Sequence, residues 1–97
     1  MIEVLRTARL NSWLLKLRDD EAMSRIMKRV DRVATGNLGD VASVGDGVSE
    51  MRIFYGPGYR IYFVRRGRAL IVLLCGGDKS TQANDIRDAK QMAREIL

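Results

Sequence analysis

The sequence predicts an α+β domain in the order β-α-α-β-β-β-α. Apolar residues recur at helical spacing in two stretches near the N-terminus and in one near the C-terminus. Between them lie three short runs rich in β-branched and aromatic residues, separated by turns that contain glycine. This order favours an antiparallel meander sheet with the helices packed on one face and the other face left for function. A chain of 97 residues has room for one hydrophobic core, so we expect a single domain over residues 1–97.

The first part of the chain supplies a strand and two helices. Residues 2–5 are a short apolar segment flanked by charges, which we interpret as a strand. Thr7 is placed to cap a helix whose apolar residues extend over positions 10–17. The acidic run 19–21 ends this helix and begins a second one, which the pair 36–37 (Gly-Asn) closes.

The second helix carries four cations, Arg25, Lys28, Arg29 and Arg32, on the face opposite its apolar stripe. Such a face is able to touch RNA, but most charged helix faces are only solvated. We therefore interpret this one as solvated.

The central part of the chain predicts a loop and three strands. Residues 39–47 hold three glycines and two aspartates, which is typical of a loop, and strands are predicted at 48–55, 59–65 and 69–75. The string 56–58 (Gly-Pro-Gly) marks the turn between the first two strands. The third strand is apolar at every position, which indicates a place inside the sheet with both of its faces covered.

A tight connection then leads to the last helix. It begins at residues 78–81, where Ser80 or Thr81 is able to cap the helix. Beyond it, alanines and isoleucines from 83 to 96 line one side of the helix.

Strand alternation predicts which side chains share the open face of the sheet. A three-residue loop at 56–58 would pair Phe54 with Arg60, and Arg52 with Tyr62. A two-residue loop would mix the polar and apolar sets, so we favour the first register. It yields two cations for phosphates and two rings on which bases are able to stack.

Positive charge is concentrated in the strand region. The chain has a formal net charge of +5 and a pI of about 9.9, which points to polyanionic partners. Residues 51–77 contain no acidic residue and no lysine. The five arginines of this stretch, whose planar groups suit bidentate contact with phosphate, are Arg52, Arg60, Arg65, Arg66 and Arg68.

Composition argues against a membrane span or export. The longest apolar run, 69–75, is much shorter than the roughly 20 residues that cross a bilayer, and residues 1–10 lack a signal-peptide apolar region. We expect a cytoplasmic protein. The lone Cys75 lies in that apolar run, which predicts a buried, unreactive thiol. With one cysteine and no histidine we expect no metal site, and we expect no cofactor.

Three strings in the chain resemble one known toxin family. They are residues 47–53 (GVSEMRI), 55–63 (YGPGYRIYF) and 73–82 (LLCGGDKSTQ). They are similar to the HigB-like addiction module killer branch of the RelE/ParE toxin superfamily. The resemblance implies a RelE-like fold and the toxin of a type II toxin–antitoxin module. Such a toxin cuts mRNA on the ribosome, inhibits translation and is neutralised by a cognate helix-turn-helix antitoxin.

The resemblance also implies roles for particular residues. Arg60 occupies the position of the arginine that contacts the scissile phosphate, Arg52 that of a second basic residue, and Lys79 that of a basic group after the last strand. These three are the expected catalytic residues. Apart from the resemblance, the residues that we expect to contact RNA are Phe54, Tyr62, Arg65 and Asp78.

The general acid and base are left open by the sequence. Cleavage of RNA by its own 2′-hydroxyl needs a base for that hydroxyl and an acid for the leaving oxygen. The candidates are Lys79, Glu50, Asp78 and Tyr62, and nothing in the sequence chooses among them.

Two other functions fit the same sequence. A ParE-like inhibitor of DNA gyrase would use this scaffold without needing Arg52 and Arg60 on one phosphate-binding face. A non-catalytic nucleic-acid-binding module would need only the charge and the stacking rings.

Overall fold

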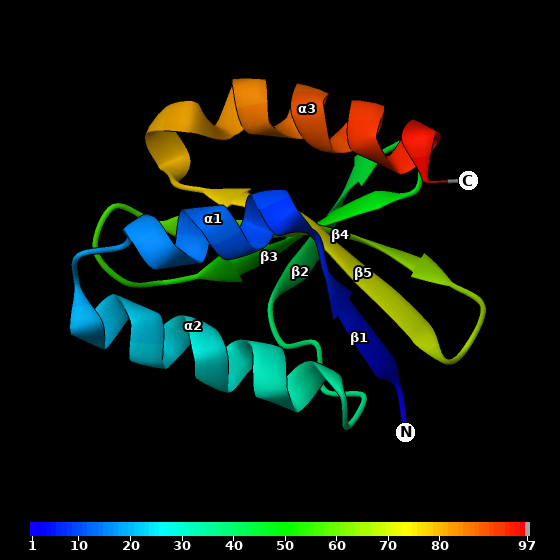
Figure 1. Ribbon diagram of the computed structural model, residues 1–97, viewed down its shortest axis with the longest axis horizontal. Coiled ribbons are helices and arrows are strands. Elements are labelled where there is room, and N and C mark those ends of the chain that lie inside the picture. Colours follow the sequence, from blue (N-terminus) through cyan, green and yellow to red (C-terminus); the bar gives the residue numbers. More distant parts are fainter. Residues whose placement is uncertain (97) are drawn as a thin grey trace.

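The computed structural model describes residues 1–96 and shows a twisted five-stranded sheet with three helices packed on it (Figure 1). The strand order is β1-β5-β4-β3-β2, with β1 parallel to β5 and the other pairs antiparallel. The elements are β1 (Glu3–Arg6), α1 (Ala8–Lys16), α2 (Asp20–Val33), β2 (Val41–Gly45), β3 (Val48–Ile53), β4 (Tyr59–Arg66), β5 (Leu70–Gly77), a 3-10 turn η1 (Lys79–Thr81) and α3 (Gln82–Glu95).

The α+β class and the order of the predicted elements are confirmed, but the sheet has one strand more than predicted. Residues 39–47, which we expected to form a loop, contain β2, an edge strand paired with β3. Its loop-like composition comes from the hairpin turn, where Gly45, Asp46 and Gly47 all have positive φ. None of its five residues is fully buried, so the strand needs little apolar character.

The helices lie on both faces of the sheet, which corrects the predicted one-sided packing. A Cβ atom added at Gly76 would lie 2.5 Å from the ring of Trp13 in α1. One added at the next residue, Gly77, would lie 1.8 Å from the carboxylate of Asp85 in α3. Successive Cβ atoms of a strand point to opposite faces, so α1 and α3 cover opposite sides of β5.

Each face therefore has its own hydrophobic core. The helices α1 and α2 enclose the larger core, formed by Leu10, Leu14, Ile26, Val30, Val33, Met51, Ile53, Ile61, Phe63, Ile71 and Leu73. The helix α3 covers a smaller one, formed by Val48, Tyr62, Val64, Leu74, Cys75, Ala89 and Ala93. In Figure 1 the sheet runs between α3 above and α2 below. The prediction that the strand β5 is covered on both faces is confirmed.

The pairing of β3 with β4 differs from the predicted register by two residues. Arg52 pairs with Arg60, and Glu50 pairs with Tyr62, because the connecting loop spans residues 54–58 rather than three residues. A shift of two residues keeps every side chain on its predicted face. Phe54 is displaced, since it lies in the loop and not in the strand.

The predicted helix starts are confirmed for α1 and α2. The Thr7 hydroxyl accepts a hydrogen bond from the backbone N–H of Leu10, and the Asp19 carboxylate accepts two from the first turn of α2. Before α3 the expected cap was Ser80 or Thr81. Thr81 does lie at the N-cap position of α3, although its side chain makes no capping hydrogen bond. Asp78 caps the preceding turn η1, where its carboxylate accepts from the backbone N–H and the hydroxyl of Ser80.

Two further expectations concern Cys75 and the membrane. Cys75 is 1% exposed, and burial raises the pKa of its thiol to about 11, so the predicted buried thiol is confirmed. None of the helices within residues 1–96 combines the length and the apolar character needed to span a bilayer.

Candidate functional site

Arg60 lies in a polar group of two buried and two half-buried residues that we call the Arg60 cluster: Glu50, Arg60, Tyr62 and Gln82. The Arg60 Nε atom lies 3.5 Å from Glu50 Oε2, and Arg60 Nη1 donates to the carbonyl of Gly58 at 2.6 Å. Glu50 is 3% exposed, and the same oxygen accepts from the Tyr62 hydroxyl at 3.1 Å and from Gln82 Nε2 at 2.8 Å. Strands β3 and β4 and helix α3 thus converge on one carboxylate.

This arrangement changes the expected role of Arg60. Only 13% of the Arg60 side chain is exposed, so it does not stand freely out of the sheet as the alternation pattern predicted. Its positive charge compensates the buried carboxylate of Glu50. The contact with Glu50 is an ion pair without hydrogen-bond geometry, and the buried Nε has no hydrogen-bond partner within residues 1–96.

Tyr62 does not offer a stacking surface. Its ring is 0% exposed and belongs to the core beneath α3, so the predicted contact of this ring with an RNA base is wrong. Burial raises the pKa of its phenol, and the neighbouring carboxylate of Glu50 raises it further.

Arg52 and Lys79 lie at the same end of the sheet as Arg60. Arg52 is the cross-strand partner of Arg60, and its guanidinium binds both carboxylate oxygens of Asp40, at 2.8 and 3.1 Å. This contact lowers the pKa of Asp40. Lys79 is exposed, and its backbone N–H donates to the carbonyl of Pro57. A Cβ atom added at Gly58 would lie 3.0 Å from Arg60 Nη1 and 3.6 Å from Lys79 Cβ. The three predicted catalytic residues are therefore brought together.

The other predicted RNA contacts are scattered. Arg65 lies at the opposite end of β4 from Arg60, where its guanidinium donates to the carbonyl of Arg68. Asp78 is half-buried and engaged in capping Ser80. Phe54 is 79% exposed on the β3–β4 loop, so a ring is available there, away from Tyr62.

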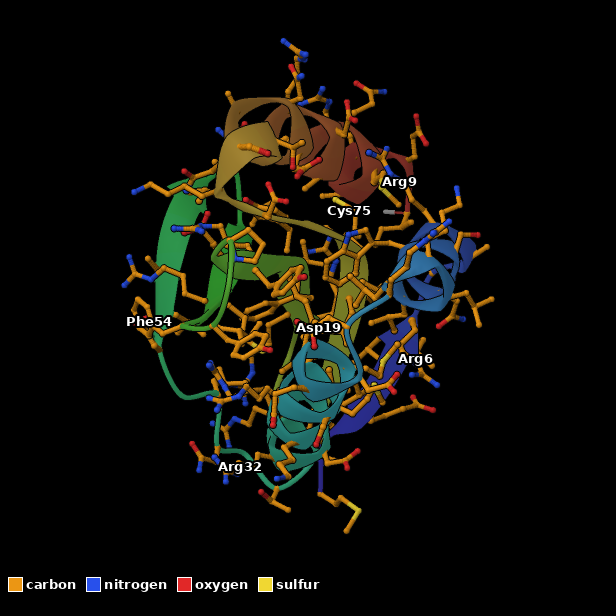
Figure 2. The ribbon with its side chains drawn as sticks, turned by 90° about the vertical axis from the view of Figure 1, so that its left-hand side faces the viewer. Arg6, Arg9, Asp19, Arg32, Phe54 and Cys75 are labelled. Atoms are coloured by element: carbon orange, nitrogen blue, oxygen red, sulfur yellow. The ribbon has the colours of Figure 1, made fainter. Side chains whose placement is uncertain are left out.

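A second site, which we call the α2 groove, lies between α2 and the β3–β4 loop. Its volume is about 410 Å³. Figure 2 shows Phe54 and Arg32 on the same side of the molecule. The cationic helix face, which we interpreted as merely solvated, forms one wall of a groove that sequence reasoning missed. Its lining residues are Glu21, Arg25, Lys28, Arg29, Arg32, Ile53 and Phe54.

The four cations of the groove differ in their surroundings. Arg29 is half-buried and donates to the backbone carbonyls of Leu38, Asp40 and Arg52, while burial lowers its pKa. Arg25 forms an ion pair with Glu21 at 3.3 Å, and its guanidinium lies 4.7 Å from the centre of the Tyr55 ring. The side chains of Lys28 and Arg32 are exposed and make no hydrogen bond or ion pair with any residue from 1 to 96.

The helical spacing of these cations was visible in the sequence. The position of Phe54 beside them was not, because it depends on the length of the β3–β4 loop. Over residues 1–96, no group of three or more His, Cys, Asp or Glu side chains is placed to hold a metal ion.

Two comparisons with known proteins cover most of the chain. The family described as "Phage derived protein Gp49-like (DUF891)" matches residues 12–96. An uncharacterized protein of Haemophilus influenzae is 46% identical over 95 residues, which is 98% of this chain and 96% of that protein.

Proposed function

The chain belongs to the Gp49-like family of phage-derived proteins, a family related to toxin–antitoxin systems, and on this premise we propose that it is the toxin of a type II toxin–antitoxin module. In this proposal it is a ribosome-dependent mRNA endonuclease of RelE/ParE type, close to the HigB-like branch. It acts in the cytoplasm, inhibits translation and is neutralised by a cognate helix-turn-helix antitoxin.

The observation that carries the proposal is the gathering of Arg52, Arg60 and Lys79 at one end of the sheet. Cleavage of RNA builds negative charge on the scissile phosphate, and fixed cations stabilise that charge. Arg60 is held in place by Glu50 on one side and by the Gly58 carbonyl on the other. A guanidinium fixed in this way loses little freedom when it meets the phosphate.

Burial favours one of the four candidates for proton transfer. Glu50 and Tyr62 are buried and hydrogen-bonded to each other, and Asp78 caps Ser80. Lys79 is exposed beside the Arg60 cluster. We assign Lys79 the role of proton donor to the leaving oxygen, with the ribosome supplying the position of the RNA.

A second candidate function is a nucleic-acid-binding module that does not cut. It is favoured because Arg52 and Arg60 form ion pairs with carboxylates of the protein, so that both positive charges are already balanced before an RNA phosphate arrives. Steeply salt-dependent RNA binding without any cleavage would support it.

The test is to map the 5′ ends of cellular mRNA after brief induction of the protein in a bacterial host. We expect new 5′ ends inside reading frames, and we expect them to disappear from a transcript whose start codon has been removed. Arg60→Lys keeps a charge beside Glu50 but loses the planar fork, so the new ends should fall about a hundredfold. Arg66→Lys, at the other end of the same strand, is the matched control.

If the 5′ ends are unchanged in cells that contain soluble protein, the proposed endonuclease activity is refuted. Arrested growth with intact mRNA and altered DNA supercoiling would favour inhibition of gyrase instead.

A further inference from the structure

We propose that the α2 groove is a docking site for single-stranded RNA, separate from the Arg60 cluster, in which Lys28 and Arg32 bind phosphates and Phe54 stacks on a base. The inference rests on the proposed function only for the choice of RNA as the polyanion. It adds a second contact surface on the other side of the sheet, because Arg60 and Tyr62 share the face that α3 covers.

The two free cations of the groove are one helical turn apart. Lys28 and Arg32 are i and i+4 on α2, so their side chains are neighbours on the same face of the helix. Neither is neutralised within residues 1–96, in contrast to Arg25, which is paired with Glu21. Two unpaired cations side by side form a site for the phosphates of a nucleic-acid backbone.

The ring of Phe54 stands on a firmly held loop. Contacts hold the chain on both sides of Phe54: Arg29 of α2 donates to the carbonyl of Arg52 near the end of β3, and the side-chain hydroxyl of Tyr55 in the loop donates to Asp19, the N-cap of α2, at 2.9 Å. The backbone N–H of Gly58 donates to the carbonyl of Tyr55 and closes the turn. An exposed ring on a preorganised loop offers a stacking surface at little entropic cost.

The lining of the groove favours RNA over an acidic protein segment. Among residues 1–96, the apolar side chains that line it are Phe54 and Ile53, and Ile53 is 4% exposed because it packs in the core. A bound peptide needs a set of apolar contacts that become buried together, and this groove offers a single ring. A nucleic acid needs cations for its backbone and one ring for each stacked base, which is what the groove supplies.

The experiment measures the binding of a fluorescein-labelled 12-nucleotide oligouridine RNA by fluorescence anisotropy over a series of salt concentrations. The double variant Lys28→Glu/Arg32→Glu should bind at least about tenfold more weakly. Its slope of log K against log salt should fall by about 1.4, since each phosphate contact to a single strand contributes about 0.7. Phe54→Ala should weaken binding at least about fivefold with an unchanged salt slope.

The matched control is Lys16→Glu/Arg87→Glu, which changes the net charge equally at exposed positions of α1 and α3. We expect it to keep most of the affinity, and thermal melting should show all three variants folded. Three outcomes would refute the RNA docking site. The first is a control that loses as much affinity as the groove variant, and the second is a Phe54→Ala variant that binds like the wild type. The third outcome is displacement of the RNA by a 12-residue polyglutamate at equal concentration. If the protein binds RNA through the groove but never cuts mRNA, the docking site is supported and the proposed endonuclease activity is refuted.

Discussion

The Arg60 cluster and the α2 groove both place arginines near the β3–β4 loop, but they differ in whether the positive charge is paired with a carboxylate. The Arg60 side chain, which is 13% exposed, lies against the buried carboxylate of Glu50, and that carboxylate also accepts hydrogen bonds from Tyr62 and Gln82. In the groove, Lys28 and Arg32 point their charge into solvent without a partner among residues 1–96.

The difference shows that a count of cations does not locate a polyanion site. A buried, paired guanidinium is fixed in orientation and its charge is balanced, so it suits a contact that strengthens as charge develops on a substrate. Exposed, unpaired cations attract a polyanion from a distance and hold it in a salt-dependent way. We therefore assign chemistry to the first region and binding to the second.

The largest expected effect comes from breaking the buried pair. Glu50→Ala leaves Arg60 buried without its counter-charge, which should reduce the free energy of unfolding by about 3–5 kcal/mol in a urea titration. Glu21→Ala removes the exposed partner of Arg25 and should cost at most about 1 kcal/mol. Equal losses in the two variants would show that the Arg60 cluster is not a buried ion pair in solution.

Within the groove, Arg29 should behave like the buried arginine rather than like Lys28 and Arg32. A Cβ atom at Gly39 would lie 2.8 Å from Arg29 Nη2, whereas one at Gly47 would meet nothing within 4 Å, and both glycines have positive φ. Gly39→Ala should therefore destabilise by about 1–3 kcal/mol more than Gly47→Ala. Thermal melting of the two variants checks this difference, and equal melting temperatures would mean that Arg29 moves freely.

The smallest expected effect is on the stability of the fold at acidic pH. Hydrogen bonds from the α2 backbone and Tyr55 lower the pKa of Asp19, and Arg52 lowers that of Asp40. A lowered folded-state pKa gives stability that is present above the unfolded pKa of about 3.9 and is lost as pH falls through the folded value. In the double variant Asp19→Asn/Asp40→Asn, the urea midpoint should therefore fall less steeply with decreasing pH below about pH 4 than it does in the wild type. An acid limb as steep as that of the wild type would contradict these contacts.

The pattern of the chain predicted the elements better than their packing. The uniformly apolar strand at 69–75 indicated cover on both faces, and this observation already conflicted with helices on a single face. The parallel pairing of β1 with β5 joins residues 67 positions apart, a separation for which local patterns carry no signal. Strand β2 was missed because half-exposed edge strands need few apolar residues.

The candidate site was predicted to a similar extent: the face on which each residue lies was foreseen, but its neighbours were not. Alternation placed Arg52, Arg60 and Tyr62 on one face, and this survived a register shift because the shift was even. Alternation says nothing of what covers a face, so the burial of Tyr62 under α3 was not foreseen. The acidic partners Asp40 and Glu50 lie 12 and 10 positions from their arginines, and only the tertiary structure shows the pairing.

The division between chemistry and binding is tested most directly by cleavage of mRNA on purified ribosomes at increasing concentrations of the protein. Arg60→Lys should lower the maximal rate about a hundredfold and leave the half-saturating concentration unchanged. Lys28→Glu/Arg32→Glu should raise the half-saturating concentration at least about tenfold and keep the maximal rate. A wild-type maximal rate for Arg60→Lys, or a lowered maximal rate with unchanged half-saturation for the groove variant, would contradict the division.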